Sequence, residues 1–275
     1  MLRHLFSKPF NLKRPKLKDF RNIHAGERCF VIGNGPSLTR MNLSLLNGEI
    51  LFASNGIYHL FSKVKWRPSY YSCVDAVVLR DQKKEIIQMQ EVDPEIRCFF
   101  PDKIPDAYIP KKNIPVESFI PYKEGTCFFR QMLPQAGIGP DGLFPKKPEQ
   151  SLVRPYTVTA TLLQLAHLMG CSPIYLIGCD TYYQPQENTK EVQTSRIAGT
   201  KIFQADCNND PNHFDPAYFG RGKQYQDPKV DKMVTHYEAI KHASSRLGFS
   251  IYNAGINSQL EVFPKVDYEQ LFSKR

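Results

Sequence analysis

Short apolar runs, most of them ending at a glycine or a polar residue, recur along the chain and constrain its fold more than any other feature. They cover residues 28–32, 49–55, 68–75, 96–100, 173–178 and 249–253, with a further candidate at 116–120. A run that is apolar on both faces is typical of a parallel strand buried under helices. Helical patterns lie between these runs, at 76–91, 157–169 and 229–247. The alternation predicts an α/β fold, with an open, mostly parallel sheet and helices on both faces.

The rest of the chain divides around this core. In the helix predicted over 157–169, Leu162, Leu165, Ala166 and Met169 share one face, and Gly170 ends it. Residues 121–155 and 181–226 lack periodicity, so we expect a loop insertion or small subdomain over the first segment and a long, lid-like loop insertion over the second. The sequence thus predicts a basic arm over residues 1–25 and a single domain over 26–267.

The charge of the chain indicates anionic partners. Its formal net charge is +9, and basic residues interleaved with apolar ones gather within residues 1–21. Such a segment either contacts an anionic membrane surface or forms a solvated arm. No nucleic-acid-binding module is recognisable, so nucleic acid is not an expected partner. Without a signal peptide or a bilayer-length apolar run, the expected location is cytoplasmic, with peripheral contact to the inner membrane face as an option.

The seven cysteines form no CxxC pair, and several lie inside apolar runs. They are predicted to be small, reduced core residues. A zinc site is not predicted.

The sequence Gly33-Asn34-Gly35-Pro36-Ser37 directly follows the first apolar run. Glycines allow a close backbone approach to a ligand and positive φ angles, and Pro36 suits a first helical position. A helix that begins here would present free N–H groups to an anion. The segment lacks the GK[ST] of a P-loop and the third glycine of the dinucleotide fingerprint. It is therefore either a phosphate- or nucleotide-contacting turn or a plain strand-to-helix turn.

Polar residues at other strand ends extend this candidate site. Ligands of open α/β sheets bind outside the carboxyl ends of the strands, where Asn55, Asp75 and Asp180 are predicted to lie. An asparagine can contact a base or sugar, whereas an aspartate binds ribose or a metal or caps a loop. Farther along, His213 lies between aromatic residues in a polar loop and is a candidate general base.

These motifs carry a resemblance to known families. The Gly33–Leu38 segment, Asn55, and the segment from Thr157 through Gly178 to Asp180 resemble the bacterial sialyltransferases of glycosyltransferase family 42. They equally resemble the wider MptE-like superfamily, named for the archaeal 6-hydroxymethylpterin diphosphokinase. The C-terminal pattern over residues 252–267 is similar to the branch found in surface-polysaccharide clusters. The resemblance extends in outline over residues 27–267.

The sialyltransferase resemblance implies a Rossmann-like pocket for a nucleotide sugar, CMP-linked, without a metal or other cofactor. Its first-turn asparagine falls on Asn34 and its second-strand asparagine on Asn55. Together with the glycine turn and the strand ends, the expected donor contacts are Gly33, Asn34, Gly35, Ser37, Asn55, Asp75 and Asp180. A Thr-Ser-Gly helix start falls on Thr157-Val158-Thr159, where only the first threonine is kept. Tyr182 falls on a phosphate-contacting tyrosine, and the catalytic histidine falls near His213.

Three functions follow from these patterns. The first is an inverting glycosyltransferase in which His213 deprotonates a glycan or lipid-linked acceptor. The second is an Mg-dependent diphosphokinase, in which Asp75 and Asp180 could be magnesium ligands. The third is a non-catalytic nucleotide-binding protein on the same fold.

Overall fold

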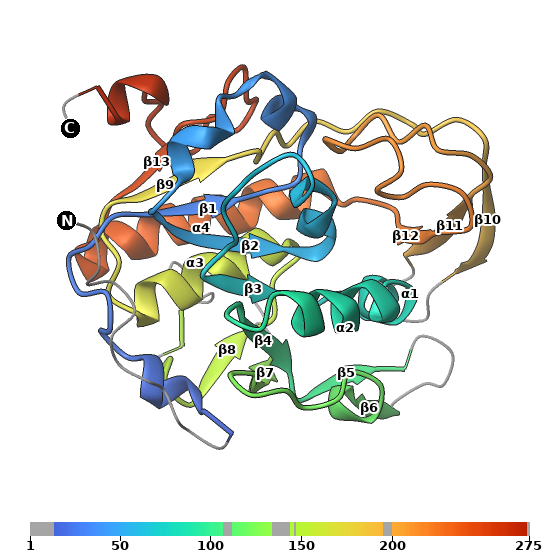
Figure 1. Cartoon of the computed structure of the whole chain (residues 1–275), viewed down its shortest axis with the longest axis horizontal. Coiled ribbons are helices and arrows are strands. Elements are labelled where there is room, and N and C mark those ends of the chain that lie inside the picture. Colours follow the sequence, from blue (N-terminus) through green and yellow to red (C-terminus); the bar gives the residue numbers. More distant parts are fainter. Residues whose placement is uncertain (1–13, 107–111, 134–143, 146, 195–199, 274–275) are drawn as a thin grey trace.

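The computed structural model describes residues 14–106, 112–133, 144–145, 147–194 and 200–273. Within these residues, eight strands form one sheet in the order β13-β9-β1-β2-β3-β4-β7-β8 (Figure 1). All neighbouring strands are parallel. The fold is therefore the predicted Rossmann-like α/β fold. The strands are β1 Cys29–Ile32, β2 Ile50–Ser54, β3 Tyr70–Ser72, β4 Arg97–Pro101, β7 Cys127–Met132, β8 Ser151–Val153, β9 Ile174–Ile177 and β13 Ile251–Asn253.

Helices cover both faces of the sheet, as predicted. Along β1, Cys29 and Val31 belong to one core cluster, and Phe30 and Ile32 belong to the other. This alternation shows why the run is apolar throughout, because a strand buried on both faces sends successive side chains into two cores. The first core contains residues of α3 and α4, and the second contains residues of α1 and α2. The helices are α1 Ala76–Asp81, α2 Lys83–Val92, α3 Val158–Leu168 and α4 Val230–Leu247, and the 3-10 helices are η1 Leu17–Phe20, η2 Pro36–Arg40, η3 Leu43–Leu46, η4 Asn55–Leu60, η5 Val116–Ser118 and η6 Glu269–Leu271.

The helix ends follow the sequence signals. Gly170 after α3 and Gly248 after α4 have φ angles of 82° and 75°, a left-handed conformation that favours glycine. However, α3 is buried almost all round rather than on one face, and Thr161 and Gln164 are fully buried. The Gln164 side chain accepts a hydrogen bond from the Val153 N–H and donates one to the Val153 carbonyl oxygen. This helix therefore fixes strand β8 in place.

Both predicted loop insertions contain strands. The segment 121–155 supplies β7 and β8 to the main sheet, and the candidate strand at 116–120 contains only η5. The segment 181–226 contains an antiparallel sheet in the order β10-β11-β12, which lies apart from the main sheet in Figure 1. A separate hairpin joins β5 and β6. These additional strands are β10 Thr189–Thr194, β11 Lys201–Ala205, β12 Gln224–Gln226, β5 Lys103–Pro105 and β6 Asn113–Pro115.

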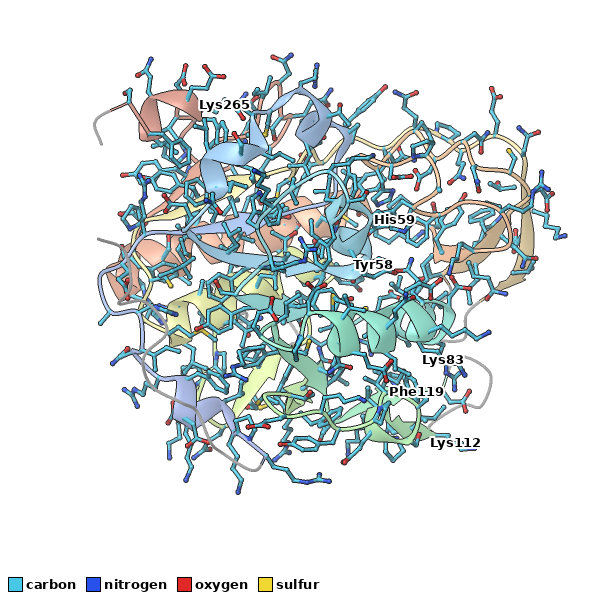
Figure 2. All side chains as sticks on the ribbon, in the orientation of Figure 1. Tyr58, His59, Lys83, Lys112, Phe119 and Lys265 are labelled. Atoms are coloured by element: carbon cyan, nitrogen blue, oxygen red, sulfur yellow. The ribbon has the colours of Figure 1, made fainter. Side chains whose placement is uncertain are left out.

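The three-stranded insertion is fastened to the main domain by polar contacts. Lys223, next to β12, donates a hydrogen bond to Glu85 of α2. The Gly56 N–H of η4 donates to the Tyr218 hydroxyl at 3.2 Å. In the same 3-10 helix, which carries the labelled Tyr58 and His59 in Figure 2, the His59 ring packs against Tyr218. The insertion therefore has a defined position over the carboxyl end of β2.

The described part of the predicted basic arm packs against the domain. Leu17 and Phe20 of η1 are buried, and the Phe20 ring contacts Phe99 edge-to-face at 4.8 Å. Backbone hydrogen bonds join Asn22 and His24 to the end of α3. Residues from 17 to 25 are thus part of the fold, whereas residues 1–13 lie outside the described residues. No helix in the described residues is long and apolar enough to cross a membrane.

The cysteines behave as the sequence predicts. All seven are free thiols, and every one except Cys207 is buried. Burial raises the pKa of Cys179 to about 12, because a thiolate would lose its hydration there. These side chains act as small core residues.

Candidate functional site

The glycine turn lies where the strand order reverses. From β1 the chain builds the sheet outward to β8 and then returns through α3 to β9, on the other side of β1. At such a switch point the carboxyl ends of the two central strands leave a crevice for ligands. Here the Gly35 N–H donates to the Gly178 carbonyl oxygen at 2.8 Å, and the Gly33 N–H donates to Ile177 at the same distance. The turns after β1 and β9 are thus bonded to each other.

This contact, rather than a positive φ angle, is what requires the two glycines. A Cβ on Gly33 would lie 2.2 Å from the Gly178 carbonyl oxygen, and one on Gly35 would lie 2.4 Å from an Asp180 carboxylate oxygen. Gly35 has an ordinary φ of −69°. The expectation of left-handed glycines is therefore wrong at this turn. The close approach exists, but it is to the neighbouring strand end.

The anion at the start of η2 is the protein's own Asp180. Its carboxylate accepts from the Ser37 N–H at 2.8 Å and from the Ser37 hydroxyl at 2.5 Å. Ser37 is buried and lines neither of the two cavities at this edge of the sheet. The predicted α-helix start is a five-residue 3-10 helix. Ser37 and Asp180 therefore stabilise the turn by bonding to each other.

Asn34 and Asn55 lie side by side at this edge with unpaired amide oxygens. The Asn34 amide nitrogen donates to the Ser54 carbonyl oxygen at 3.1 Å, immediately before Asn55. Both side-chain oxygens are buried and have no hydrogen-bond partner among the described residues. Asn55 itself has a φ of 50°. Because buried acceptors are rarely left unpaired, these two oxygens are suited to a ligand's donor groups.

Two helices begin at the wall of the same crevice. Thr157 occupies the N-cap position of α3, and Lys229 occupies that of α4. Neither side chain accepts a hydrogen bond from the backbone N–H groups of its helix. A helix N-terminus carries partial positive charge and free N–H groups that favour an anion. Thr159 is buried and bonds instead to Cys179 and Tyr237. Thr157 lines both cavities and Thr159 lines the smaller one, and both side chains interact with Tyr237.

His213 is paired with a buried carboxylate. Its Nδ1 lies 2.7 Å from Asp210 Oδ2, and the Asp210 side chain is only 1% exposed. Asp210 also accepts from the N–H groups of Asn212 and Phe219. The His213 ring stacks on Tyr218 at 3.9 Å, with an angle of 2° between the planes. These contacts fix the imidazole and, with the proton on Nδ1, leave Nε2 as the basic nitrogen.

Asp75 is a helix cap in this structure. Its Oδ1 accepts from the N–H groups of Val77 and Val78, at 2.8 and 3.0 Å, at the start of α1. Its Oδ2 accepts from the Gln226 amide of the insertion at 2.7 Å. Asp75 lines the larger cavity, but both of its oxygens are engaged in holding α1 and β12 together.

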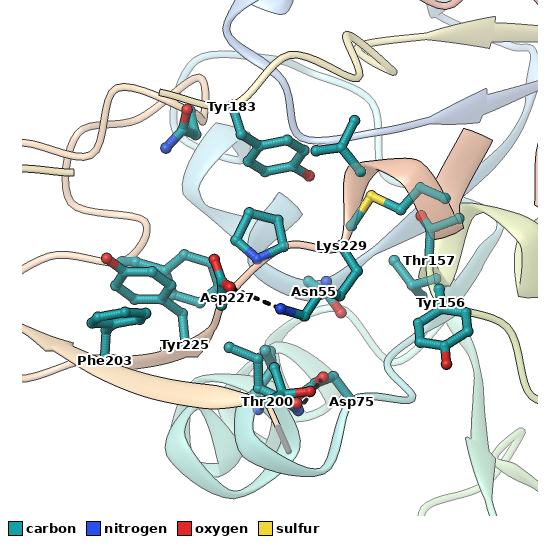
Figure 3. A pocket seen from close by; sticks show the side chains of 18 of the residues that line it. Asn55, Asp75, Tyr156, Thr157, Tyr183, Thr200, Phe203, Tyr225, Asp227 and Lys229 are labelled. Atoms are coloured by element: carbon teal, nitrogen blue, oxygen red, sulfur yellow. Dashed lines mark hydrogen bonds and ion pairs between the residues drawn. The ribbon is translucent and has the colours of Figure 1, made fainter. Parts of the chain in front are cut away.

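Tyr183 lies deeper in the site than the predicted Tyr182. Tyr182 is 50% exposed and lines only the smaller cavity. Tyr183 lines both cavities, and burial raises the pKa of its hydroxyl to about 12. Its ring points into the larger cavity (Figure 3). As a neutral donor at physiological pH, Tyr183 is the better placed of the two to contact a ligand.

The two cavities adjoin each other at the carboxyl edge of the sheet. The larger has a volume of about 750 Å³ and the smaller about 80 Å³. Cavities of several hundred Å³ are typical of sites for nucleotides and drug-sized ligands. The glycine turn and Asn34 line the small one, the insertion lines the large one, and His213 and Asn55 line both. The small cavity is therefore the inner end of one larger site.

Sequence reasoning missed several residues of this site. Asp210 precedes His213 by three residues, and this spacing is the signal that could have found the pair. Arg154 lines the large cavity, and no ion-pair partner is found for it among the described residues. Lys229 forms an ion pair with Asp227 at 3.0 Å within the same cavity (Figure 3). These charged residues lie outside the apolar runs of the sequence, so the pattern that predicted the strands did not reveal them.

The described residues contain no group of three or more histidine, cysteine or acidic side chains that could hold a metal ion. All four carboxylate oxygens of Asp75 and Asp180 already accept hydrogen bonds from the protein. The two carboxylates therefore do not fit a shared magnesium site in this arrangement.

The fold and this crevice define an α/β protein of the Rossmann-like class, with its site at the switch point of a parallel sheet. The family model described as "6-hydroxymethylpterin diphosphokinase MptE-like" matches residues 3–186, which is more than half of the chain. The chain belongs to this family, as the sequence resemblance predicted. No curated protein matches it.

A solved structure supports the fold assignment. The chain is similar to the structure of a MAf glycosyltransferase from Magnetospirillum magneticum AMB-1, with a TM-score of 0.50 and 14% sequence identity. The match covers 94% of this chain but only 38% of the other. The likeness shows a shared fold, and the chain spans well under half the length of that protein.

Proposed function

We propose that the chain is a glycosyltransferase that uses a nucleotide-activated sugar, CMP-linked, in surface glycan synthesis. The observation that carries this proposal is the His213–Asp210 pair, which lines a cavity of about 750 Å³ at the switch point of the sheet. An imidazole fixed beside a cavity that accommodates a nucleotide sugar is suited to deprotonate a second substrate. The fold shared with a solved glycosyltransferase is consistent with this function.

The residues present account for binding of the donor. The unpaired amide oxygens of Asn34 and Asn55 would accept from hydroxyl or amino groups of the nucleoside. The N-terminus of α3, with Arg154 nearby on the cavity wall, would hold the phosphate. The two glycines line the inner end of the site, where the turns after β1 and β9 are bonded to each other.

The proposed reaction is a single displacement. His213 Nε2 takes the proton of an acceptor hydroxyl, and that oxygen attacks the anomeric carbon of the donor. The bond between the anomeric carbon and the phosphate oxygen breaks, so the configuration inverts and CMP leaves with the electron pair. Asp210 stabilises the imidazolium that forms, since its buried carboxylate already accepts from Nδ1. The positive end of α3 stabilises the leaving phosphate.

The first experiment is a panel of nucleotides in a thermal-shift assay, with CMP, CDP, UDP, GDP and ATP as probes. A ligand that binds only the folded state raises the melting temperature in proportion to its affinity. We expect the cytidine nucleotides to stabilise the protein most. Stabilisation by none of the five would favour a non-catalytic role without nucleotide binding.

The second experiment tests the base. CMP release from CMP-N-acetylneuraminic acid, with water as the acceptor, is measured for the wild type, for His213→Ala and for the control His242→Ala, whose exposed residue lies on α4. Loss of a general base typically lowers the rate by about 10²- to 10⁴-fold, while CMP should still raise the melting temperature of His213→Ala. Undiminished release in His213→Ala would remove the base assignment.

A diphosphokinase activity is the second candidate, because the matching family model is named for that enzyme. It would transfer a diphosphate from ATP to a small alcohol and would use magnesium, which binds carboxylate and phosphate oxygens. Asp75 and Asp180 would then have to exchange their present hydrogen bonds for the metal. Turnover that survives EDTA supports the glycosyltransferase, whereas an EDTA-sensitive reaction with ATP supports the diphosphokinase.

A further inference from the structure

Three aromatic rings of the insertion form a continuous stack on the wall of the large cavity. Phe203 of β11 and Tyr225 of β12 are directly opposite each other across the strand pair, with ring centroids 5.7 Å apart and planes at 27°. Phe219 stacks on Tyr225 at 5.3 Å and 25°. All three rings line the cavity, although the sequence pattern had indicated only an unstructured loop here.

The stack leads directly to the candidate base. The His213 ring meets Phe219 edge-to-face, with centroids 5.0 Å apart and planes at 90°. Phe219 is buried, whereas Phe203 and Tyr225 are partly exposed to the cavity. A ligand lying on the two exposed rings would therefore share a cavity wall with the imidazole and be separated from it by Phe219.

The polar groups around the stack suit a ligand rich in hydroxyl groups. Asp227 lies beside Tyr225, and Asp75, which accepts from the Gln226 amide, lies between the aromatic rings and the start of α3 (Figure 3). Asp227 Oδ2 is paired with the Lys229 ammonium at 3.0 Å, which leaves Asp227 Oδ1 to accept a hydrogen bond from a hydroxyl group. Tyr156 and Thr157, at the start of α3, lie on the opposite side of the cavity (Figure 3). The end suited to phosphate and the aromatic end are therefore separate.

We propose that Phe203 and Tyr225 form the subsite for the acceptor, and that the acceptor presents an uncharged pyranose ring to them. The C–H groups on one face of a pyranose are slightly positive and pack against the negative face of an aromatic ring. Asp227 Oδ1 beside the rings accepts a hydroxyl group from the sugar's edge, and another hydroxyl is directed at His213 Nε2. This proposal rests on the glycosyltransferase function and adds the chemical class of its second substrate.

The test measures saccharide binding by saturation-transfer NMR on the full chain in the presence of CMP. The probes are lactose, methyl β-galactopyranoside and methyl N-acetyl-β-glucosaminide. We expect transfer to the ring protons of at least one probe with the wild type and with Tyr225→Phe, which keeps the ring. Tyr225→Leu and, independently, Phe203→Leu should bind that probe about tenfold more weakly, a change of about 1.4 kcal/mol.

The matched control is Tyr252→Leu. Tyr252 stacks on Tyr175 at 5.7 Å and 26°, is likewise partly exposed, and lines neither cavity. This variant should bind the saccharide as the wild type does. The affinity for CMP should remain within about twofold of the wild-type value in every variant.

Three results would overturn the proposal. They are no transfer to any of the three saccharides with the wild type, unchanged binding in both leucine variants, or a loss of CMP affinity in place of saccharide affinity. The last result would mean that the rings stack on the nucleobase. Each of these results can be told apart from a failure of the proposed glycosyltransferase function, because release of CMP that depends on His213 can be measured without a saccharide.

Discussion

His236 is a buried neutral histidine, and its titration should make the fold sensitive to mild acid. It lies on α4 with no exposed surface. Its Nδ1 accepts a hydrogen bond from the Tyr156 N–H at 3.1 Å, and its Nε2 is buried without a partner among the described residues. Burial, with a smaller contribution from Lys232, lowers the pKa of His236 to about 4. Protonation would break the bond to Tyr156, since a protonated Nδ1 can no longer accept.

The magnitude follows from the two pKa values. The unfolded chain takes up the proton near the ordinary value of 6.5, and the folded protein does so only near 4. The stability due to neutral His236 is therefore fully present above about pH 6.5 and is lost as the pH falls to about 4. A tenfold difference in proton affinity is worth about 1.36 kcal/mol. The titration of His236 should therefore lower the free energy of unfolding by roughly 2–3 kcal/mol between pH 7 and pH 4.5.

The assay is urea unfolding of three proteins at pH 7 and pH 4.5: the wild type, His236→Gln and the control His242→Gln. Glutamine keeps an acceptor for the Tyr156 N–H but does not titrate in this range. Other groups titrate equally in all three proteins, so the difference between the pH-dependent losses isolates one histidine. Between pH 7 and pH 4.5, the free energy of unfolding of His236→Gln should fall by roughly 2–3 kcal/mol less than that of the wild type. The control His242→Gln should lose as much as the wild type, because His242 is exposed. Equal losses in His236→Gln and the wild type would refute a buried neutral histidine.

Three further predictions concern the site. Asp210→Asn should slow CMP release by about 10²- to 10⁴-fold because it favours the wrong imidazole tautomer, while the CMP-induced rise in melting temperature should persist; a normal rate would separate Asp210 from the reaction. Gly33→Ala should lower the free energy of unfolding by about 3 kcal/mol or more, because its Cβ would lie 2.2 Å from a carbonyl oxygen. The control Gly48→Ala, which meets no atom within 4 Å, should show only the cost of about 1 kcal/mol for a positive φ angle, and equal losses in urea unfolding would contradict the packing argument. Arg154→Met should weaken CMP binding about tenfold in calorimetry and leave cytidine binding unchanged, because only CMP carries a phosphate; an equal effect on both would place Arg154 away from the phosphate.

The sequence predicted the central strands because each is buried on both faces. The run at 28–32 contains β1, and that at 173–178 contains β9, and both are apolar from end to end. Strand β7 escaped prediction because its second half carries Arg130 and Gln131 and is not fully buried. The insertion strands are largely polar, since only part of one face packs inward, and their pattern matches that of a loop.

The functional reading of the turn could not come from the sequence, because it depends on residues about 145 positions away. The distance from Gly33 to Gly178 is set by the order in which strands enter the sheet. For the same reason the sequence could not tell whether Asp180 binds a ligand or Ser37. His213 was found because an isolated histidine in a polar loop is conspicuous, but its partner Asp210 became evident only when the loop was folded.

The polar groups at the carboxyl edge of the sheet differ in whether they are available to a ligand. Acidic strand-end residues attract attention first in a sequence, yet Asp75 and Asp180 are engaged in bonds that hold α1, the insertion and the turn in place. The groups that remain available are the amide oxygens of Asn34 and Asn55 and the N-terminus of α3. Neutral acceptors beside a positive helix end suit a nucleoside and its phosphate, which argues for a donor bound without carboxylate ligands. The proposed transfer reaction then needs from this chain only the base that His213 supplies.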